Sequence, residues 1–262
     1  MTPFSQILAQ LNAASGGDTA TPTEDWLQGR TTYGGLTAAL CVEAARQAIP
    51  DLPALRSAQF AFIGPASGPL RPSTRVLRRG KSSLYLGVDI EGDAGPAARA
   101  LLAFGADRPS GLAYQALPAP ACPPPEDCAP FFMDGRGPRF AAHFDTRLAG
   151  GARPMTPGAA PDVLVWSRHL DPLARDSLVG LIALADALPP AAMTCFQAPA
   201  PISTSTWSFD MLTTEPRSPE GWWLFRSTAE TIGDGYSTQS MTLWRPDGRP
   251  VLVGRQNVAV FA

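Results

Sequence analysis

The sequence predicts an α+β fold built from two tandem copies of one module, each with a buried helix and a run of antiparallel strands. Three observations lead to this prediction. Two apolar segments have the spacing of a buried helix, strand-length runs separated by Gly and Pro turns follow each of them, and both series end on related hairpins. Such an order is typical of an α+β module, and its repetition indicates internal duplication.

The helix of the first module is expected to open at Tyr33-Gly34-Gly35-Leu36 and to run to Ile49. It is rich in Ala on almost every side, so we expect it to be buried, and Pro50 prevents its continuation. Runs of strand length with turn residues between them then predict four strands: Leu55–Ile63, Thr74–Leu77, Ser82–Ile90 and Ala97–Phe104.

A proline-rich segment separates the two copies. Between Gly111 and Pro130 the chain is dominated by Pro and Ala, and proline cannot donate a hydrogen bond to a β-ladder. Such a stretch is typical of a connector between domains. We therefore place the first module at residues 1–112, the linker at 113–135 and the second module at 136–262.

The second module is expected to contain one helix with strands on both sides of it. Asp171-Pro172 is a favourable helix start, the apolar run Leu173–Leu188 forms the helix, and Pro189-Pro190 ends it. Alternating or apolar runs predict its strands: Phe140–Leu148, Val163–Arg168, Ile202–Leu212, Gly221–Glu230, Tyr236–Arg245 and Pro250–Phe261.

Composition argues against several classes of protein. Only 17% of the residues are charged and the formal net charge is −2, whereas nucleic-acid binders use clustered Lys and Arg. The chain starts without a signal-peptide pattern and has no apolar run of about 18 residues. We therefore expect a soluble cytoplasmic protein that binds neither nucleic acid nor membrane, and whose partner is a small molecule or a protein.

The cysteines and histidines show neither the spacing of a metal site nor the pattern of a catalytic triad. Cys41, Cys122, Cys128 and Cys195 lack the short paired spacings of a zinc site, so we interpret them as free thiols and expect neither a metal nor a cofactor. Neither histidine has a Ser or Cys nucleophile motif beside it, which makes a Ser-His-Asp triad a weak hypothesis.

Polar residues that occur in only one of the two copies indicate a single site per chain, in the second module. Gln256 stands where the first copy has Ala100, and Asp186 can be aligned with Cys41. Asp186 is expected in the last turn of an apolar helix, where its charge meets the negative end of the helix dipole and loses solvation if buried. Either it points to solvent, or it serves as a general base that activates a water.

Strands of the second module offer partners for this carboxylate. Because alternate strand residues share a face, Ser203 is placed with Trp207 and Phe209 on the inward face, and Thr204 on the opposite face. A single hydroxyl in a strand most often reflects β-propensity alone. Gln256 lies in an apolar strand, and an inward amide there needs partners such as a water and a carboxylate.

Together these segments resemble a known family. The chain is similar to the type II acyl-CoA thioesterases and the wider thioesterase-like superfamily, in which two hotdog modules are fused in one polypeptide. The resemblance covers nearly the whole chain and rests on the order and spacing of four segments: Gly29-Arg-Thr-Thr-Tyr-Gly-Gly35, Leu55-Arg-Ser-Ala-Gln-Phe-Ala-Phe-Ile-Gly-Pro65, Leu77-Arg-Arg-Gly80 and Val165-Trp-Ser-Arg168.

The resemblance implies hydrolysis of an acyl-CoA thioester in fatty acid metabolism, without a covalent intermediate. The family's site corresponds to Asp186, to Ser203 or Thr204, and to Gln256, which together hold and activate a water. The family usually has an acidic residue and a histidine shortly after the hydroxyl, and this chain reads Ser203-Thr-Ser-Thr-Trp207 instead. The choice between the two hydroxyls therefore stays open.

The resemblance also implies how the substrate is bound. Backbone N–H groups at a helix N-terminus would stabilise the oxyanion, and Gly34 and Gly35 open the first helix. The acyl chain is expected in an apolar slot beside the central helix, lined by Leu181, Leu184, Trp207 and Phe209. A homo-oligomer of the fused unit is expected, whereas the acyl chain length and the carrier, CoA or acyl carrier protein, are left open.

Two other functions remain compatible with this pattern. A hotdog hydratase or dehydratase normally places its catalytic His or Asp on the central helix, and neither histidine lies in Leu173–Leu188. A non-catalytic acyl-thioester-binding protein is the other alternative, because a duplicated module can lose its chemistry and keep its pocket.

Overall fold

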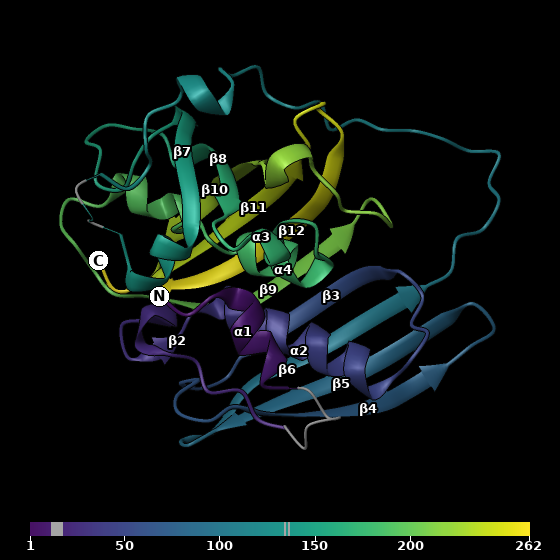
Figure 1. Cartoon of the computed structure of the whole chain (residues 1–262). Helices are drawn as coiled ribbons and strands as arrows, with labels where there is room; N and C mark the ends of the chain where they lie inside the picture. The colour runs from purple at the N-terminus through teal and green to yellow at the C-terminus, as the bar shows by residue number, and fades with distance from the viewer. Residues whose placement is uncertain (12–17, 134, 136) are drawn as a thin grey trace.

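The computed structural model of the chain describes residues 1–11, 18–133, 135 and 137–262. Ten antiparallel strands form one sheet in the order β4-β5-β6-β3-β9-β12-β11-β10-β8-β7 (Figure 1). The first half contributes α1 (Phe4–Ala9), β1 (Leu27–Gln28), β2 (Thr31–Thr32), α2 (Gly34–Ala48), β3 (Leu55–Phe62), β4 (Arg71–Arg79), β5 (Ser83–Gly92) and β6 (Gly95–Gly105). The second half contributes β7 (Phe144–Gly151), β8 (Asp162–His169), α3 (Pro172–Arg175), α4 (Leu178–Leu184), β9 (Ile202–Met211), β10 (Trp223–Gly233), β11 (Tyr236–Trp244) and β12 (Pro250–Val260).

The first module follows the prediction closely. Helix α2 is buried along most of its length, and all four predicted strands are present. The largest difference is β4, which spans Arg71–Arg79 where only Thr74–Leu77 was predicted. This strand forms one edge of the sheet and most of its residues are exposed, so polar side chains hide its strand pattern.

The predicted single helix Leu173–Leu188 is wrong. The chain forms two short helices, α3 and α4, each with its own N-cap: the Asp171 side chain accepts from Leu173 N, and the Ser177 side chain accepts from Gly180 N. A capping residue inside the apolar run ends one helix and starts the next. Helix α4 stops at Leu184, so Asp186 lies in the turn after it rather than in its last turn.

The start of the second module also differs slightly from the prediction. Residues Arg139–His143 form a short 3-10 helix, and strand β7 begins only at Phe144. The remaining strands agree with the prediction to within three residues at each end.

Strands β3 and β9 join the two modules into one continuous sheet. Phe60 lies opposite Trp207 in this pairing, with ring centroids 5.5 Å apart. On the inner face, α2 packs against α4. A Cβ atom on Gly35 would lie 2.5 Å from the Ala183 carbonyl oxygen, which shows that the two helices approach as closely as glycine allows.

A second, smaller cluster of apolar side chains covers the outer face of the second module. Its buried members are Cys128, Leu164, Trp166, Trp222, Leu224 and Trp244. Residues 117–128 of the proline-rich segment lie over it, since Trp166 Nε1 donates to the Pro123 carbonyl and Trp244 Nε1 donates to the Leu117 carbonyl, both at 2.9 Å. This segment is therefore packed onto the second module.

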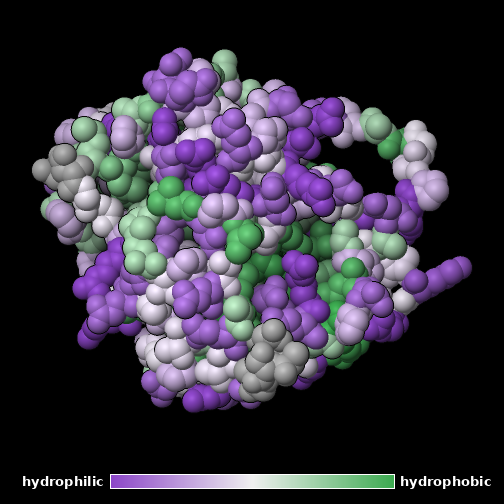
Figure 2. Space-filling model, in the orientation of Figure 1, coloured by the Kyte–Doolittle hydropathy of each residue, from purple (hydrophilic) through white to green (hydrophobic). Residues whose placement is uncertain are grey.

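The residues that precede this covering segment are arranged differently. Leu112 and Tyr114 are 90% and 94% exposed. Figure 2 shows this part of the chain as an arm with open space between it and the body. Within the part of the chain that the structure describes, no helix has the length and apolarity needed to cross a membrane.

Candidate active site

Asp186 lies where the two modules meet, in the turn after α4 and against the start of α2. A Cβ atom on Gly34 would come within 2.8 Å of Asp186 Oδ2, and the backbone N–H of Gly35 faces the carboxylate and lowers its pKa. The expected conflict with the dipole of its own helix is therefore offset by the N-terminus of α2, whose free N–H groups favour a negative charge.

Gln256 on β12 is the closest side-chain partner of this carboxylate. Its Nε2 donates to Asp186 Oδ1 at 2.5 Å. The structure thus brings together Asp186 and Gln256, two residues that are 70 positions apart in the chain.

A third polar residue, Gln239 on β11, was missed by the sequence reasoning. Its Nε2 donates to Gln256 Oε1 at 2.7 Å, and its Oε1 accepts from the backbone N–H of Ala191 at 2.9 Å. Gln239 is 1% exposed and lies directly opposite Gln256 in the β11–β12 register. The sequence of the β11–β12 hairpin could have indicated it, because each of the two strands has a glutamine at an inward position.

The electrostatic setting of Asp186 is unusual for a carboxylate. Burial raises its pKa to about 7, although the hydrogen bond from Gln256 and the Gly35 N–H both lower it. Beside it the buried Tyr33 hydroxyl donates to the Ala183 carbonyl at 2.6 Å, and burial together with the charge of Asp186 raises the pKa of this phenol. A carboxyl group that ionises near neutral pH is suited to accept a proton from water.

A cavity of about 390 Å³ lies beside Asp186, with walls from both modules. Its polar wall includes Gln28, Thr31, Thr32, Thr37, Asp186, Ser203 and Thr204. Its apolar and small residues are Gly34, Phe62, Ile63, Gly64, Pro65, Ala66, Ala97 and Ile202. The cavity can therefore place a polar reacting group at the carboxylate and an apolar group against the first module.

The predicted faces of the two hydroxyls are wrong because β9 contains a bulge. Thr206 pairs with Asn257 and Thr204 pairs with Val258, which leaves Ser205 as an extra residue. One extra residue reverses the alternation of side chains beyond it. Thr204 is therefore paired with the buried Val258, on the face that carries Gln256, whereas Ser203 is exposed.

Comparison with known proteins matches both halves of the chain to one family. Residues 22–105 match the family model of the acyl-CoA thioesterase N-terminal domain, and residues 125–260 match that of the acyl-CoA thioesterase C-terminal domain. The chain belongs to the acyl-CoA thioesterase family. A comparison with curated proteins finds no match.

Solved structures confirm that this thioesterase-family chain has the tandem hotdog fold. A hotdog-fold protein of unknown function from Alicyclobacillus acidocaldarius is 23% identical with a TM-score of 0.83, over 93% of this chain and 92% of that one. A candidate thioesterase II from Thermobifida fusca is 25% identical, with a TM-score of 0.78 over 93% and 92% of the chains. An acyl-CoA thioesterase II from Mycobacterium marinum is 20% identical, with a TM-score of 0.73 over 93% of both chains.

The structure corrects the expected acyl slot of this thioesterase-family chain. Leu181, Leu184, Trp207 and Phe209 are at most 2% exposed and belong to the central core, and none of them is on the wall of the cavity beside Asp186. The two aromatic residues of this set pack within the core, where the Trp207 ring lies against the rings of Phe60 and Phe209. Of the predicted substrate contacts, Gly34 is on the cavity wall and Gly35 contributes its N–H to Asp186.

Both histidines contact other residues of the fold and lie away from the cavity beside Asp186. His143 stacks on Trp26 with ring centroids 3.8 Å apart. His169 shares a hydrogen bond of 2.8 Å with the Gly180 carbonyl, and burial lowers its pKa to about 4. Neither ring is on the wall of the cavity beside Asp186.

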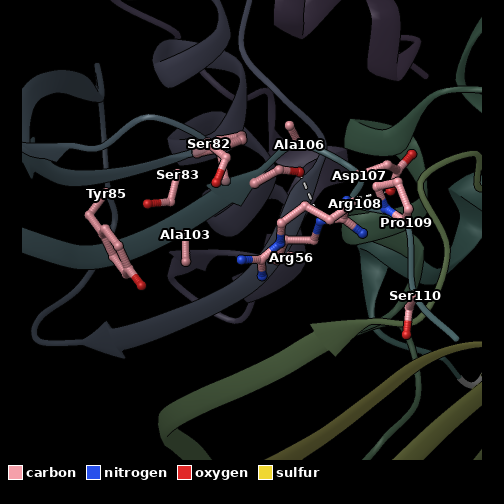
Figure 3. Close-up of a pocket in the computed structure, with 12 residues that line it drawn as sticks. Arg56, Ser82, Ser83, Tyr85, Ala103, Ala106, Asp107, Arg108, Pro109 and Ser110 are labelled. Atoms are coloured by element: carbon pink, nitrogen blue, oxygen red, sulfur yellow. Dashed lines mark hydrogen bonds and ion pairs between the residues drawn. The ribbon is translucent and has the colours of Figure 1, made fainter. Parts of the chain in front are cut away.

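A larger groove of about 920 Å³ lies at the other end of β3, which starts at Leu55 (Figure 3). Arg56, Tyr85 and Arg108 are on its wall, and Arg56 pairs with Asp107 at 2.6 Å. The groove is open and its carboxylate is already neutralised by an arginine, so it offers no general base comparable to Asp186.

Proposed function

We propose that the chain hydrolyses acyl-CoA thioesters to a free acid and CoA. The observation that carries this proposal is the Asp186 carboxylate beside a cavity shared by both modules, held by Gln256 and by the start of α2. A base of this kind, next to a space for substrate, is suited to hydrolysis by an activated water.

In the proposed mechanism no covalent enzyme intermediate forms. Asp186 accepts a proton from a water, whose oxygen attacks the thioester carbonyl carbon while Gln256 orients the carboxylate. The first turn of α2 stabilises the negative charge that develops on the carbonyl oxygen. The tetrahedral intermediate then collapses, the C–S bond breaks, and the proton leaves with the CoA thiolate.

Release of free thiol from a panel of acyl-CoAs of different chain length tests this function directly. Release from at least one substrate supports the proposal, and a parallel panel of acylated acyl carrier protein identifies the carrier. If no substrate releases thiol although acyl-CoA raises the Tm, the chain is an acyl-thioester-binding protein instead. Water addition to an enoyl-CoA, without thiol release, would support a hydratase.

The proposal includes a setting for this activity. We place the protein in the cytoplasm, in fatty acid metabolism, as a homo-oligomer of the fused unit. The exposed sheet edge at β4 makes such assembly physically reasonable. Sedimentation equilibrium of the purified chain measures the oligomeric state.

The pH dependence of hydrolysis follows from Asp186. The reactive form is the carboxylate, and its pKa is raised to about 7. We therefore expect kcat/KM to rise as the pH rises through about 7 and to level off above it. A pH profile of thiol release from pH 5 to pH 9 measures this, and activity that is already constant from pH 5 would contradict the role of Asp186.

The two candidate hydroxyls are expected to differ in their contribution. Because Thr204 is paired on the face that carries Gln256, the variant T204V should lower kcat on the order of 10², as loss of a hydrogen bond to the reacting group does. The matched variant S203A removes the exposed hydroxyl next to it and should leave kcat nearly unchanged. The reverse order of effects in thiol-release assays would assign the hydroxyl to Ser203.

A further inference from the structure

Three amide groups form a chain of hydrogen bonds that ends on the Asp186 carboxylate. The Ala191 N–H donates to Gln239 Oε1, Gln239 Nε2 donates to Gln256 Oε1, and Gln256 Nε2 donates to Asp186 Oδ1. The distances are 2.9, 2.7 and 2.5 Å. Both glutamines are buried, at 1% and 4% exposure.

The Ala191 N–H fixes which groups donate and which accept along this series of hydrogen bonds. A glutamine amide can turn over and exchange its oxygen and nitrogen, but a backbone N–H can only donate. The Ala191 N–H therefore requires the oxygen of Gln239, which leaves the Gln239 NH₂ group to face Gln256. This NH₂ in turn requires the Gln256 oxygen, so that the Gln256 NH₂ must face Asp186.

We propose that Gln239 is a positioning residue for hydrolysis: anchored by Ala191, it holds Gln256 with its NH₂ group toward Asp186 and so keeps this carboxylate in its reactive, ionised form. This inference rests on the proposed function. Gln239 acts only through Gln256, and it is not on the wall of the cavity.

The first module indicates that the fold itself does not need an amide at this position. In the β5–β6 pair Val88 lies opposite Ala100, and Ala100 lies opposite Phe60. The corresponding residues of the second module are Gln239, Gln256 and Trp207. The same sheet position is thus filled by Val88 without any polar partner, whereas a buried amide costs stability unless all its groups are bonded.

Loss of Gln239 should change the protonation of Asp186 without direct contact to it. With the Gln256 oxygen released, the amide can turn and present that oxygen to Asp186. An oxygen acceptor favours the protonated carboxyl group, whereas the NH₂ donor favours the carboxylate. The Gly35 N–H from α2, which also lowers the pKa of this carboxylate, stays in place, and so does the titratable phenol of Tyr33, whose own pKa is raised by the charge of Asp186.

The decisive experiment compares wild type with Q239L, A191P and S237A. Q239L removes the middle amide. A191P removes the anchoring N–H and puts the proline Cδ in its place, which displaces the Gln239 oxygen; Ala191 is the first residue of a short 3-10 helix, where proline is tolerated. S237A is the matched control, because Ser237 is buried on the same strand and its hydroxyl has no hydrogen-bond partner among the described residues.

Two measurements are made on each variant. The first is kcat and KM for thiol release against pH. The second is the titration of the Asp186 carboxyl carbon by ¹³C NMR, assigned by its loss in D186N, which needs no turnover.

For Q239L and A191P we expect the Asp186 midpoint to rise by at least ~0.5 pH unit, and kcat at pH 7 to fall at least about twofold with KM nearly unchanged. S237A should change neither. An unmoved midpoint in Q239L and A191P would overturn the inference and make Gln239 a structural residue. If wild type released no thiol, the proposed function would fail, while the NMR midpoints would still decide whether Gln239 controls Asp186.

Discussion

Replacement of Asp186 by Asn is expected to lower kcat for thiol release by about 10²–10⁴, the usual contribution of a general base. The asparagine has the same shape and can still accept the hydrogen bond from Gln256, but it cannot take a proton from water. KM should change little, because the substrate cavity keeps its walls. Thiol-release kinetics on the variant, beside wild type, measure both constants.

The same variant is expected to gain stability at high pH although it loses activity. This gain is the control, because it shows that the loss of activity does not come from unfolding. The pKa of Asp186 lies at about 7 in the folded chain and near 3.8 in the unfolded chain, so the folded state holds the extra proton between these values. Asp186 therefore makes a contribution to the stability of wild type that falls as the pH rises from about 4 to about 7, and D186N lacks this contribution. We expect D186N to have the higher Tm at pH 8. Full activity in this variant would remove Asp186 from the mechanism.

Gly35→Ala is expected to lower the free energy of unfolding on the order of 3 kcal/mol, the upper end of the cost of overpacking. The new Cβ would lie 2.5 Å from both the Ala183 carbonyl oxygen and the ring of Tyr33, so α2 and the turn after α4 must move apart. For a chain of this size the Tm should fall by about 6–12 °C. The displaced turn carries Asp186, so turnover should fall as well.

Gly111→Ala is the matched control for this variant. It adds the same methyl group where nothing lies within 4 Å, in the exposed segment before the second module. Thermal unfolding followed by circular dichroism should show no loss of stability for G111A, since such a change restricts mainly the unfolded chain. An equal loss of Tm in both variants would refute the close helix contact as the cause.

The sheet could be predicted because its apolar residues alternate or cluster between clear turn residues. Where the pattern fails, a local cause is visible. Strand β4 is an exposed edge, so polarity hid its length, and Ser177 breaks an apolar run that looks like one helix. The bulge at Ser205 leaves no mark in composition, and it alone exchanged the faces of Ser203 and Thr204.

The site could be predicted only as a list of unusual polar residues. Asp186 and Gln256 stood out because their counterparts Cys41 and Ala100 are apolar. Their contact, and the start of α2 that faces the carboxylate, depend on how two distant modules pack, which no local pattern contains. Gln239 was missed because one polar residue in a strand rich in Ser and Thr attracts no notice.

The covering segment over the second module has a consequence for how this chain can be divided. Residues 117–128 follow the first module in sequence, yet they shelter tryptophans that belong to the second. A cut after residue 130 would leave Trp166 and Trp244 bare on one fragment and an unattached apolar tail on the other. A better point of division lies earlier, near Leu112 and Tyr114, where the chain is almost fully exposed. Two fragments of this chain that are meant to fold and associate should therefore be divided at that point.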